Sequence, residues 1–407
     1  MDSTNNRTRS LSIACATLAS ILAFTWLFLI VRYNYGGNWT GLFCIGEQSA
    51  MPPLLSDQSL YRFPQSPGYD GQFYYYIAQD PLLEADSVQY VDNPPLRWRR
   101  ILLPALAHLL AMGRKEFVAP AYIGIVLASV FLGTWWLSRF CQRLGYNALW
   151  GSCFLMIPGV AVSLDRMTVD VLLVALCIAF GFYGMAAPSW RIYPVLLFAP
   201  LARETGFILV LGFCLFCLLE RRRREALLGM AMAVPWLTWA LYLRIRLWPD
   251  GTPWMTAVPL GGLIKRILHP AQFEITGRWL AIAAVLDYAA VWGVFFALLT
   301  AGIFVWTRKT GLLELTSVVF ALLAMYVGKG DVWGETYAFG RTMSPILVWP
   351  ALLAASSRQW WMFLPLAFTV PRIGFQIMTV SIPIMHGLAN DVVTLVRYAS
   401  IAHSTTR

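Results

Sequence analysis

The feature that most constrains this chain is its series of long apolar runs, each suited to a helix in a bilayer or in a buried core. Charged residues make up only 13% of the 407 residues, about half the share in soluble domains, and the mean hydropathy is +0.60. These values exclude a water-soluble enzyme, a secreted disulfide domain and a disordered chain. We therefore expect an all-α, multi-pass protein with about eleven transmembrane helices. They are placed at 11–31, 117–138, 148–164, 169–187, 190–202, 205–219, 226–246, 283–306, 311–328, 342–356 and 360–385.

Some of these runs are too short to cross a bilayer alone. The thirteen residues 190–202 reach roughly 20 Å as a helix, against a hydrocarbon core of roughly 30 Å. We predict that 190–202 and 205–219 form a hairpin of short helices whose tip, Arg203-Glu204-Thr205, is sunk toward the membrane. The run 101–112 is also short, and it predicts an interfacial helix that does not span.

Loop charges predict the orientation of the chain. With the N-terminus in the cytoplasm, twelve Arg and Lys residues of the short loops lie inside and four lie outside, as the positive-inside rule requires. The net charge of +10 is then explained by topology, so we expect no nucleic-acid partner. The prediction is a single membrane domain, 1–407, in the cytoplasmic (inner) membrane. Its extracytoplasmic regions would be 32–116, with interfacial helices, and the loops 247–282 and 329–342.

The most informative segment is GYDGQFYYYIAQDP, residues 68–81. Gly68 and Gly71 flank Tyr69-Asp70 and permit a tight turn that exposes the carboxylate. The following FYYYIA predicts an aromatic interfacial helix that ends near Asp80. For Asp70 two interpretations stay open, a cap of this helix or a catalytic acid or base. For Asp80 a cap or turn is favoured.

Other ionisable residues adjoin apolar runs on the predicted outer side. Arg97, Arg99 and Arg100 indicate either snorkelling to lipid headgroups or a clamp for phosphate. Arg203 and Glu204 lie between two apolar stretches, where charge is costly. They could pair with each other to hold the hairpin tip, or they could bind a substrate.

Two further outer turns carry charge. The first, SLDRMTVD, favours a structural ion pair among Asp165, Arg166 and Asp170. The second, KGDVWGETYAFGRT, is either a plain hydrophilic connection or a site where Arg341, with Lys329, binds a carrier phosphate. Its charged residues are Lys329, Asp331, Glu335 and Arg341.

An aspartate in the first outer loop, after one N-terminal span, resembles the GT-C superfamily of membrane glycosyltransferases. The segments YDGQFYY-IA-DP, RWRRILLPALA, SLDRMTVD, ARETG and GRTMSP together resemble a bacterial multispanning family linked with cell-surface glycopolymer formation. The first segment is also similar, more weakly, to the WD-x-x-HF-x-x-IA motif of the second mannosyltransferase of eukaryotic GPI synthesis. Tyr69 stands where that motif has Trp, and Gln72-Phe73 where it has His-Phe.

The resemblance implies a GT-C-like fold, a polyprenyl-phosphate-linked sugar donor and Asp70 in the place of the family's catalytic aspartate. The chemistry is compatible, because sugar transfer needs one proton removed from the acceptor hydroxyl in an oxocarbenium-like transition state. The leaving phosphate is already an anion and needs no proton. Guanidinium groups suit a phosphate clamp, because they bind phosphate through a fork of donors and stay charged.

We therefore predict an inverting transfer of a hexose or pentose to a cell-envelope glycan or glycolipid acceptor outside the cytoplasm, with the lipid bilayer as a further partner. Asp70 would be the base, and Arg203 and Arg341 would hold the phosphate. The predicted substrate-binding residues are Tyr69, Gln72, Tyr74, Asp80, Arg100, Arg166, Arg203, Glu204, Lys329, Glu335 and Arg341.

No D-x-D occurs in the first loop, because Gly71 and Gln72 follow Asp70. We therefore expect no cofactor and no metal site, with a divalent cation as the alternative. Two other functions stay open for the whole chain. One is a transporter or flippase of a lipid-linked glycan, which would form no glycosidic bond. The other is a polymerase or ligase of envelope polysaccharide, which would release a pyrophosphate carrier.

Overall fold

The computed structural model describes residues 2–185, 190–247, 255–273, 276–328, 330–334 and 336–405. The protein is 77% helical, which confirms the prediction of a helical membrane fold. The strands in the described part of the chain are two short ones that pair in parallel, with Ile45 opposite Arg62 and Gly46 opposite Phe63.

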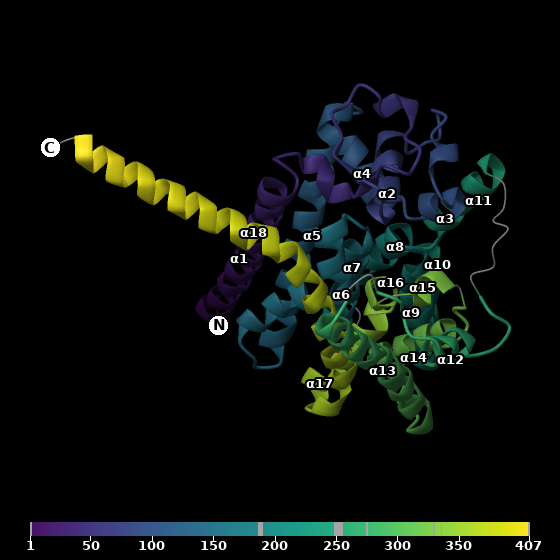
Figure 1. Cartoon of the computed structure of the whole chain (residues 1–407). Coiled ribbons are helices and arrows are strands. Elements are labelled where there is room, and N and C mark those ends of the chain that lie inside the picture. The colour runs from purple at the N-terminus through teal and green to yellow at the C-terminus, as the bar shows by residue number, and fades with distance from the viewer. Residues whose placement is uncertain are drawn as a thin grey trace.

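The N-terminal part consists of one long helix and a layer of short elements. Figure 1 shows α2, α3 and α4 grouped at one end of α1 and α5. The elements, with η for 3-10 helices, are α1 (Asp2–Asn34), η1 (Trp39–Phe43), β1 (Ile45–Gly46), η2 (Pro53–Leu55), β2 (Arg62–Phe63), α2 (Asp70–Gln79), η3 (Val88–Tyr90), α3 (Pro94–Arg99) and α4 (Leu102–Leu110).

The rest of the described chain forms the helical body. Its elements are α5 (Lys115–Arg143), η4 (Ala148–Met156), α6 (Pro158–Arg166), α7 (Asp170–Gly184), α8 (Ile192–Ala202), η5 (Glu204–Gly206), α9 (Phe207–Leu219), α10 (Arg223–Ala231), α11 (Val234–Arg246), α12 (Gly261–Leu268), α13 (Arg278–Trp306), α14 (Leu312–Met325), α15 (Gly330–Trp333), α16 (Thr336–Thr342), α17 (Ser344–Ser357), η6 (Trp360–Phe363) and α18 (Leu364–Thr405).

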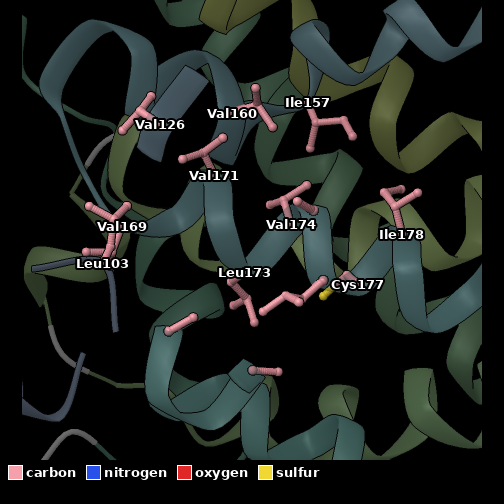
Figure 2. Close-up of a cluster of buried hydrophobic side chains, with 14 of the residues drawn as sticks. Leu103, Val126, Ile157, Val160, Val169, Val171, Leu173, Val174, Cys177 and Ile178 are labelled. Atoms are coloured by element: carbon pink, nitrogen blue, oxygen red, sulfur yellow. The ribbon is translucent and has the colours of Figure 1, made fainter. Parts of the chain in front are cut away.

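The core is centred on α7, whose side chains are buried around almost its whole circumference. A helix that is apolar on every side must be enclosed by other elements. Figure 2 shows how this is achieved, with Leu103 of α4, Val126 of α5 and Val160 of α6 gathered around Val171 and Val174 of α7. Because α7 also begins with Asp170, this enclosure fixes one acidic side chain deep in the protein.

Several helices are apolar and long enough to cross a membrane, so the chain is a multi-pass membrane protein. In the described residues these are α1, α5, α10 with α11, α13, and η6 with α18, five in all, or six if η4 and α6 count as one bent span. Eleven spans are not confirmed, because α7, α8, α9, α14 and α17 are shorter apolar helices. Helix α4 has nine residues and is also too short to span.

Two predicted spans differ in form. The run 148–164 is not one helix, because η4 and α6 meet at an angle of 59°. Proline disfavours a helical conformation in the residue before it, and Ile157 before Pro158 is indeed extended, at φ −68° and ψ 130°. The run 360–385 continues beyond its predicted end, since α18 extends to Thr405.

Candidate functional site

Asp70 is the first residue of α2 and lies where three parts of the chain meet. Its carboxylate accepts a hydrogen bond from Arg97 Nη2 of α3 at 2.8 Å, and it also accepts from Arg341 Nη2 of α16. The Asp70 side chain is 16% exposed and those of the two arginines less than 10%. Its partners are thus two guanidinium groups, and its role differs from a simple helix cap.

The turn before α2 explains how Asp70 reaches this position. Gly68 adopts φ +82°, a conformation that glycine tolerates without strain. Gly71 has no side chain, and a Cβ built there would lie 2.1 Å from the carbonyl oxygen of Arg166 at the end of α6. The two predicted turn glycines therefore let α2 approach α6 closely.

The electrostatics of Asp70 are dominated by its partners. Burial alone would raise the pKa of the carboxyl group, but the guanidinium groups of Arg341 and Arg97 outweigh it and hold the pKa well below its usual range. Arg97 is itself held by Asp92, to which Nε and Nη2 donate at 2.9 and 2.7 Å. Asp70 is therefore an anion in this arrangement.

A second ion pair lies directly behind this one. Arg203 Nη1 donates to Asp170 Oδ1, and Arg203 Nη2 donates to the Thr342 hydroxyl at 2.9 Å. The side chains of Arg203 and Asp170 are each only 2% exposed. Arg341 Nη1 is 3.6 Å from Asp170 Oδ2, so Arg341 connects the two pairs.

A third pair closes the cluster. Arg100 donates to both carboxylate oxygens of Glu204, at 2.8 and 2.7 Å, which is the fork geometry preferred by this pair. The Tyr74 hydroxyl accepts from Arg100 at 2.7 Å and from Arg97 at 3.3 Å. Glu204 Oε1 lies 3.8 Å from Arg203 Nε, so the chain of contacts returns to the second pair.

We call this group of nine residues the arginine cluster. It contains four arginines, four acids and one tyrosine: Asp70, Tyr74, Asp92, Arg97, Arg100, Asp170, Arg203, Glu204 and Arg341. Arg341 Nε, Arg341 Nη1 and Arg203 Nε are buried donors that make no hydrogen bond. A buried donor without an acceptor is costly, and an anionic oxygen is its best acceptor.

Tyr69 and Arg166 border the cluster. The guanidinium groups of Arg341 and Arg166 lie 5.2 and 5.5 Å from the centre of the Tyr69 ring, within the range of cation–π contacts. Arg166 Nε also pairs with Asp165 at 3.0 Å, whose carboxylate accepts from the Tyr337 hydroxyl at 3.1 Å. The predicted ion pair of this turn is present, but only Asp170 of its acids joins the arginine cluster.

Two predicted binding residues have structural partners instead. The Gln72 amide accepts from Gly46 N at 3.1 Å and donates to the Pro67 carbonyl at 2.9 Å, which closes the loop ahead of α2. The Asp80 carboxylate accepts from the backbone N–H groups of Glu84 and Ala85 at 2.8 and 3.0 Å. Asp80 thus forms the turn after α2, and both side chains are occupied by contacts that shape the backbone around α2.

The last two predicted residues, Lys329 and Glu335, lie outside the described residues. Of the three arginines before α4, Arg97 is the one that contacts Asp70. Arg97 and Arg100 are three residues apart and share a helix face, whereas Arg99 falls on another side. That spacing from Arg100 was the sequence feature that could have identified Arg97 as a site residue. Nothing in the sequence marked Asp92 or Thr342.

A groove lies beside the bundle, between α13 and α18. It has a volume of about 540 Å³ and a lining with almost no polar atoms, formed by Ala284, Val285, Tyr288, Ala289, Trp292, Phe296 and Phe368. On another face of α13, Asp287 pairs with Arg266 and accepts from the Thr336 hydroxyl at 2.6 Å. Because α16 runs from Thr336 to Thr342, one short helix connects α13 to the arginine cluster.

Among the described residues, no group of three or more His, Cys, Asp or Glu side chains is placed to hold a metal ion. No family model matches the chain, and no curated protein or solved structure is significantly similar to it.

Proposed function

We propose that the chain is an inverting glycosyltransferase that uses a polyprenyl-phosphate sugar donor and acts on a glycan or lipid-linked acceptor outside the cytoplasm. The observation that carries the proposal is the pairing of Asp70 with Arg97 and Arg341. A carboxylate and phosphate-binding groups are the two parts that such a transfer requires, and here they touch.

Arg341 supports the proposal because it has donors besides the one that binds Asp70. Its Nη2 donates to Asp70, while its Nε and Nη1 make no hydrogen bond. A donor phosphate that accepts a hydrogen bond from Nη1 would bind Arg341 at a different nitrogen from the one that donates to Asp70. Inversion requires the base and the leaving group to lie on opposite faces of the sugar ring.

The proposed step balances as follows. The acceptor oxygen attacks the anomeric carbon, the bond from that carbon to the phosphate oxygen breaks, and Asp70 takes the hydroxyl proton. Polyprenyl phosphate leaves with the electron pair, stabilised by Arg341 and Arg97. When a phosphate draws these arginines away from Asp70, the pKa of Asp70 rises and the carboxylate becomes a better base.

The groove between α13 and α18 supports a lipid-linked substrate. Its lining is apolar and lies on two candidate membrane spans, so it fits an isoprenoid chain rather than a free sugar. Helix α16 contacts α13 through Thr336 and carries Arg341, the proposed phosphate ligand, in its last turn. Arg203, which sequence reasoning assigned to the phosphate, supports Arg341 through Asp170.

The test is transfer in proteoliposomes supplied with labelled polyprenyl-phosphate sugar and an envelope-glycan acceptor. We expect Asp70→Asn to reduce turnover about 10²- to 10⁴-fold, the usual contribution of a general base. Asp57→Asn, the same change at an exposed position of the same layer, should retain wild-type turnover. Wild-type turnover in Asp70→Asn would exclude Asp70 as the base. Movement of the labelled lipid across the bilayer without a new glycosidic bond would favour a flippase.

A further inference from the structure

The last helix leaves the body of the protein. Figure 1 shows α18 crossing α1 and then running outward to the C-terminus without another element beside it. The crossing is fixed by polar contacts, in which Asn34 Nδ2 donates to the Val380 carbonyl at 3.1 Å, and Asp391 accepts from Arg32 at 2.7 Å and from the Tyr33 hydroxyl at 2.9 Å. Among the side chains that the structure describes, Asp391 is the last one that anchors α18 to the body.

These contacts fix the height of α18 relative to a membrane. Arg32, Tyr33 and Asn34 end the candidate span Thr8–Asn34, and an Arg–Tyr end is typical of the headgroup region. From this end the chain enters the layer of short elements that carries Asp70. The crossing point therefore lies at the membrane surface on the side of the arginine cluster.

The outward half of α18 has one apolar face and one polar face. Its apolar stripe is formed by Val392 and Val396, 58% and 63% exposed, and continues the line of Met378, Ile382 and Met385, which are 54–66% exposed and precede the Asp391 anchor. Intervals of four, three, seven and four residues place them on one side of a helix. A second stripe, also exposed, repeats every four residues and is polar: His386, Asn390 and Thr394.

The helical form of this segment requires a surface to cover the apolar face. Asp391 to Thr405 is about 21 Å of helix at 1.5 Å per residue, and an isolated helix of that length is marginal in water. Val392, Val393 and Thr394 are β-branched, which lowers helix propensity further. Burial of the apolar stripe is the contribution that stabilises it.

A lipid surface fits the stripe better than a second copy of the helix does. Leu388 and Val393 flank the stripe and are 42% and 50% exposed, so the apolar arc is wider than the two-position seam of a coiled coil. We infer that residues 386–405 form a membrane-surface helix. Its apolar stripe enters the lipid on the side of the arginine cluster, and its polar stripe faces water. This inference does not depend on the proposed glycosyl transfer.

The experiment compares two neighbouring positions of the full-length chain in phospholipid vesicles. The seven native cysteines are replaced, and a nitroxide is attached to Val392→Cys or Thr394→Cys. We expect collisions with oxygen to dominate at Val392→Cys and collisions with a water-soluble nickel chelate to dominate at Thr394→Cys. A label at the exposed Asp57→Cys gives the reference value for water.

Two results would overturn the inference. Equal access of the nickel chelate to both labels would mean that the segment projects into water. A label at Val392→Cys that is shielded from both reagents and broadened by a neighbouring spin would mean that a second copy covers the stripe.

A second measurement guards against effects of the label. Val392→Asp should increase hydrogen exchange of the amides of 388–400 in vesicles about tenfold, because one buried valine contributes about 1.5 kcal/mol. Asn390→Asp, the matched control that adds the same charge to the polar stripe, should leave exchange unchanged. Equal exchange in the two variants would contradict the inference.

Discussion

The buried pair of Arg203 and Asp170 gives a quantitative test of the arginine cluster. Asp170→Asn removes the negative charge and keeps the shape of the side chain, so the guanidinium of Arg203 loses its closest counter-charge. Both side chains are 2% exposed, so water cannot replace the lost partner. The variant therefore measures the cost of an uncompensated charge in the interior.

The structure sets the expected magnitude. Breaking a buried ion pair by removing one partner typically costs 3–5 kcal/mol. Arg203 would keep its hydrogen bond to Thr342 at 2.9 Å and the nearby carboxylate of Glu204 at 3.8 Å, so we expect about 3 kcal/mol, the lower end of that range. The double variant Asp170→Asn with Arg203→Gln removes both charges and should recover stability to within about 1 kcal/mol of wild type.

The assay is urea unfolding in detergent micelles, followed by tryptophan fluorescence. The control is Arg222→Gln, because Arg222 and Glu225 pair at 2.6 Å but their side chains are 31% and 30% exposed, where a pair contributes less than about 1 kcal/mol. The reasoning is refuted if Asp170→Asn is as stable as Arg222→Gln. It is also refuted if the double variant is no more stable than Asp170→Asn.

Three further predictions concern other parts of the site. Gly71→Ala should lower the free energy of unfolding by about 1–3 kcal/mol, because the new Cβ would meet the last carbonyl of α6 at 2.1 Å; an unchanged urea midpoint contradicts this. The pKa of Asp70 is lower in the folded protein than its ordinary value of 3.8, so its ionised carboxylate adds to the free energy of unfolding above pH 3.8, and this contribution is lost as the pH falls below that value. Arg341→Gln should reduce this loss at acidic pH. Identical profiles of the free energy of unfolding against pH in wild type and variant contradict the prediction. Ala289→Trp fills the groove and should raise KM for the lipid-linked donor about tenfold with kcat retained; an unchanged KM separates the groove from the substrate.

Much of the fold follows from the apolar pattern, because a bilayer requires helices wherever a run is apolar and long. Helices α1, α5 and α13 lie where long runs predict them. The pattern does not show what surrounds a run, so α7, which is enclosed by other helices, has the same composition as a lipid-facing span. The run 148–164 was predicted as one span although Pro158 disfavours a continuous helix there, and the angle of the break depends on the packing of α6.

Part of the site was also predictable. Asp70 was marked by its two flanking glycines, and Arg100, Arg203 and Arg341 by charge beside apolar runs. The pairing could not be predicted, because a charge pattern does not say which acid each guanidinium meets. For Glu204 a pair with its neighbour Arg203 was one of two alternatives, and its closest partner is Arg100, more than a hundred residues away.

The sequence by itself determined that the chain is helical and spans a membrane, because lipid offers no partner for an unpaired backbone group. It also identified Asp70, Arg203 and Arg341 as candidate functional residues, because a charge beside an apolar run is energetically costly. Only the tertiary structure decided that Asp70 lies between Arg97 and Arg341, and that Arg203 stands behind them with Asp170. The physical reason is that a buried charge is stabilised by whichever opposite charge the packing of distant helices brings within hydrogen-bond distance.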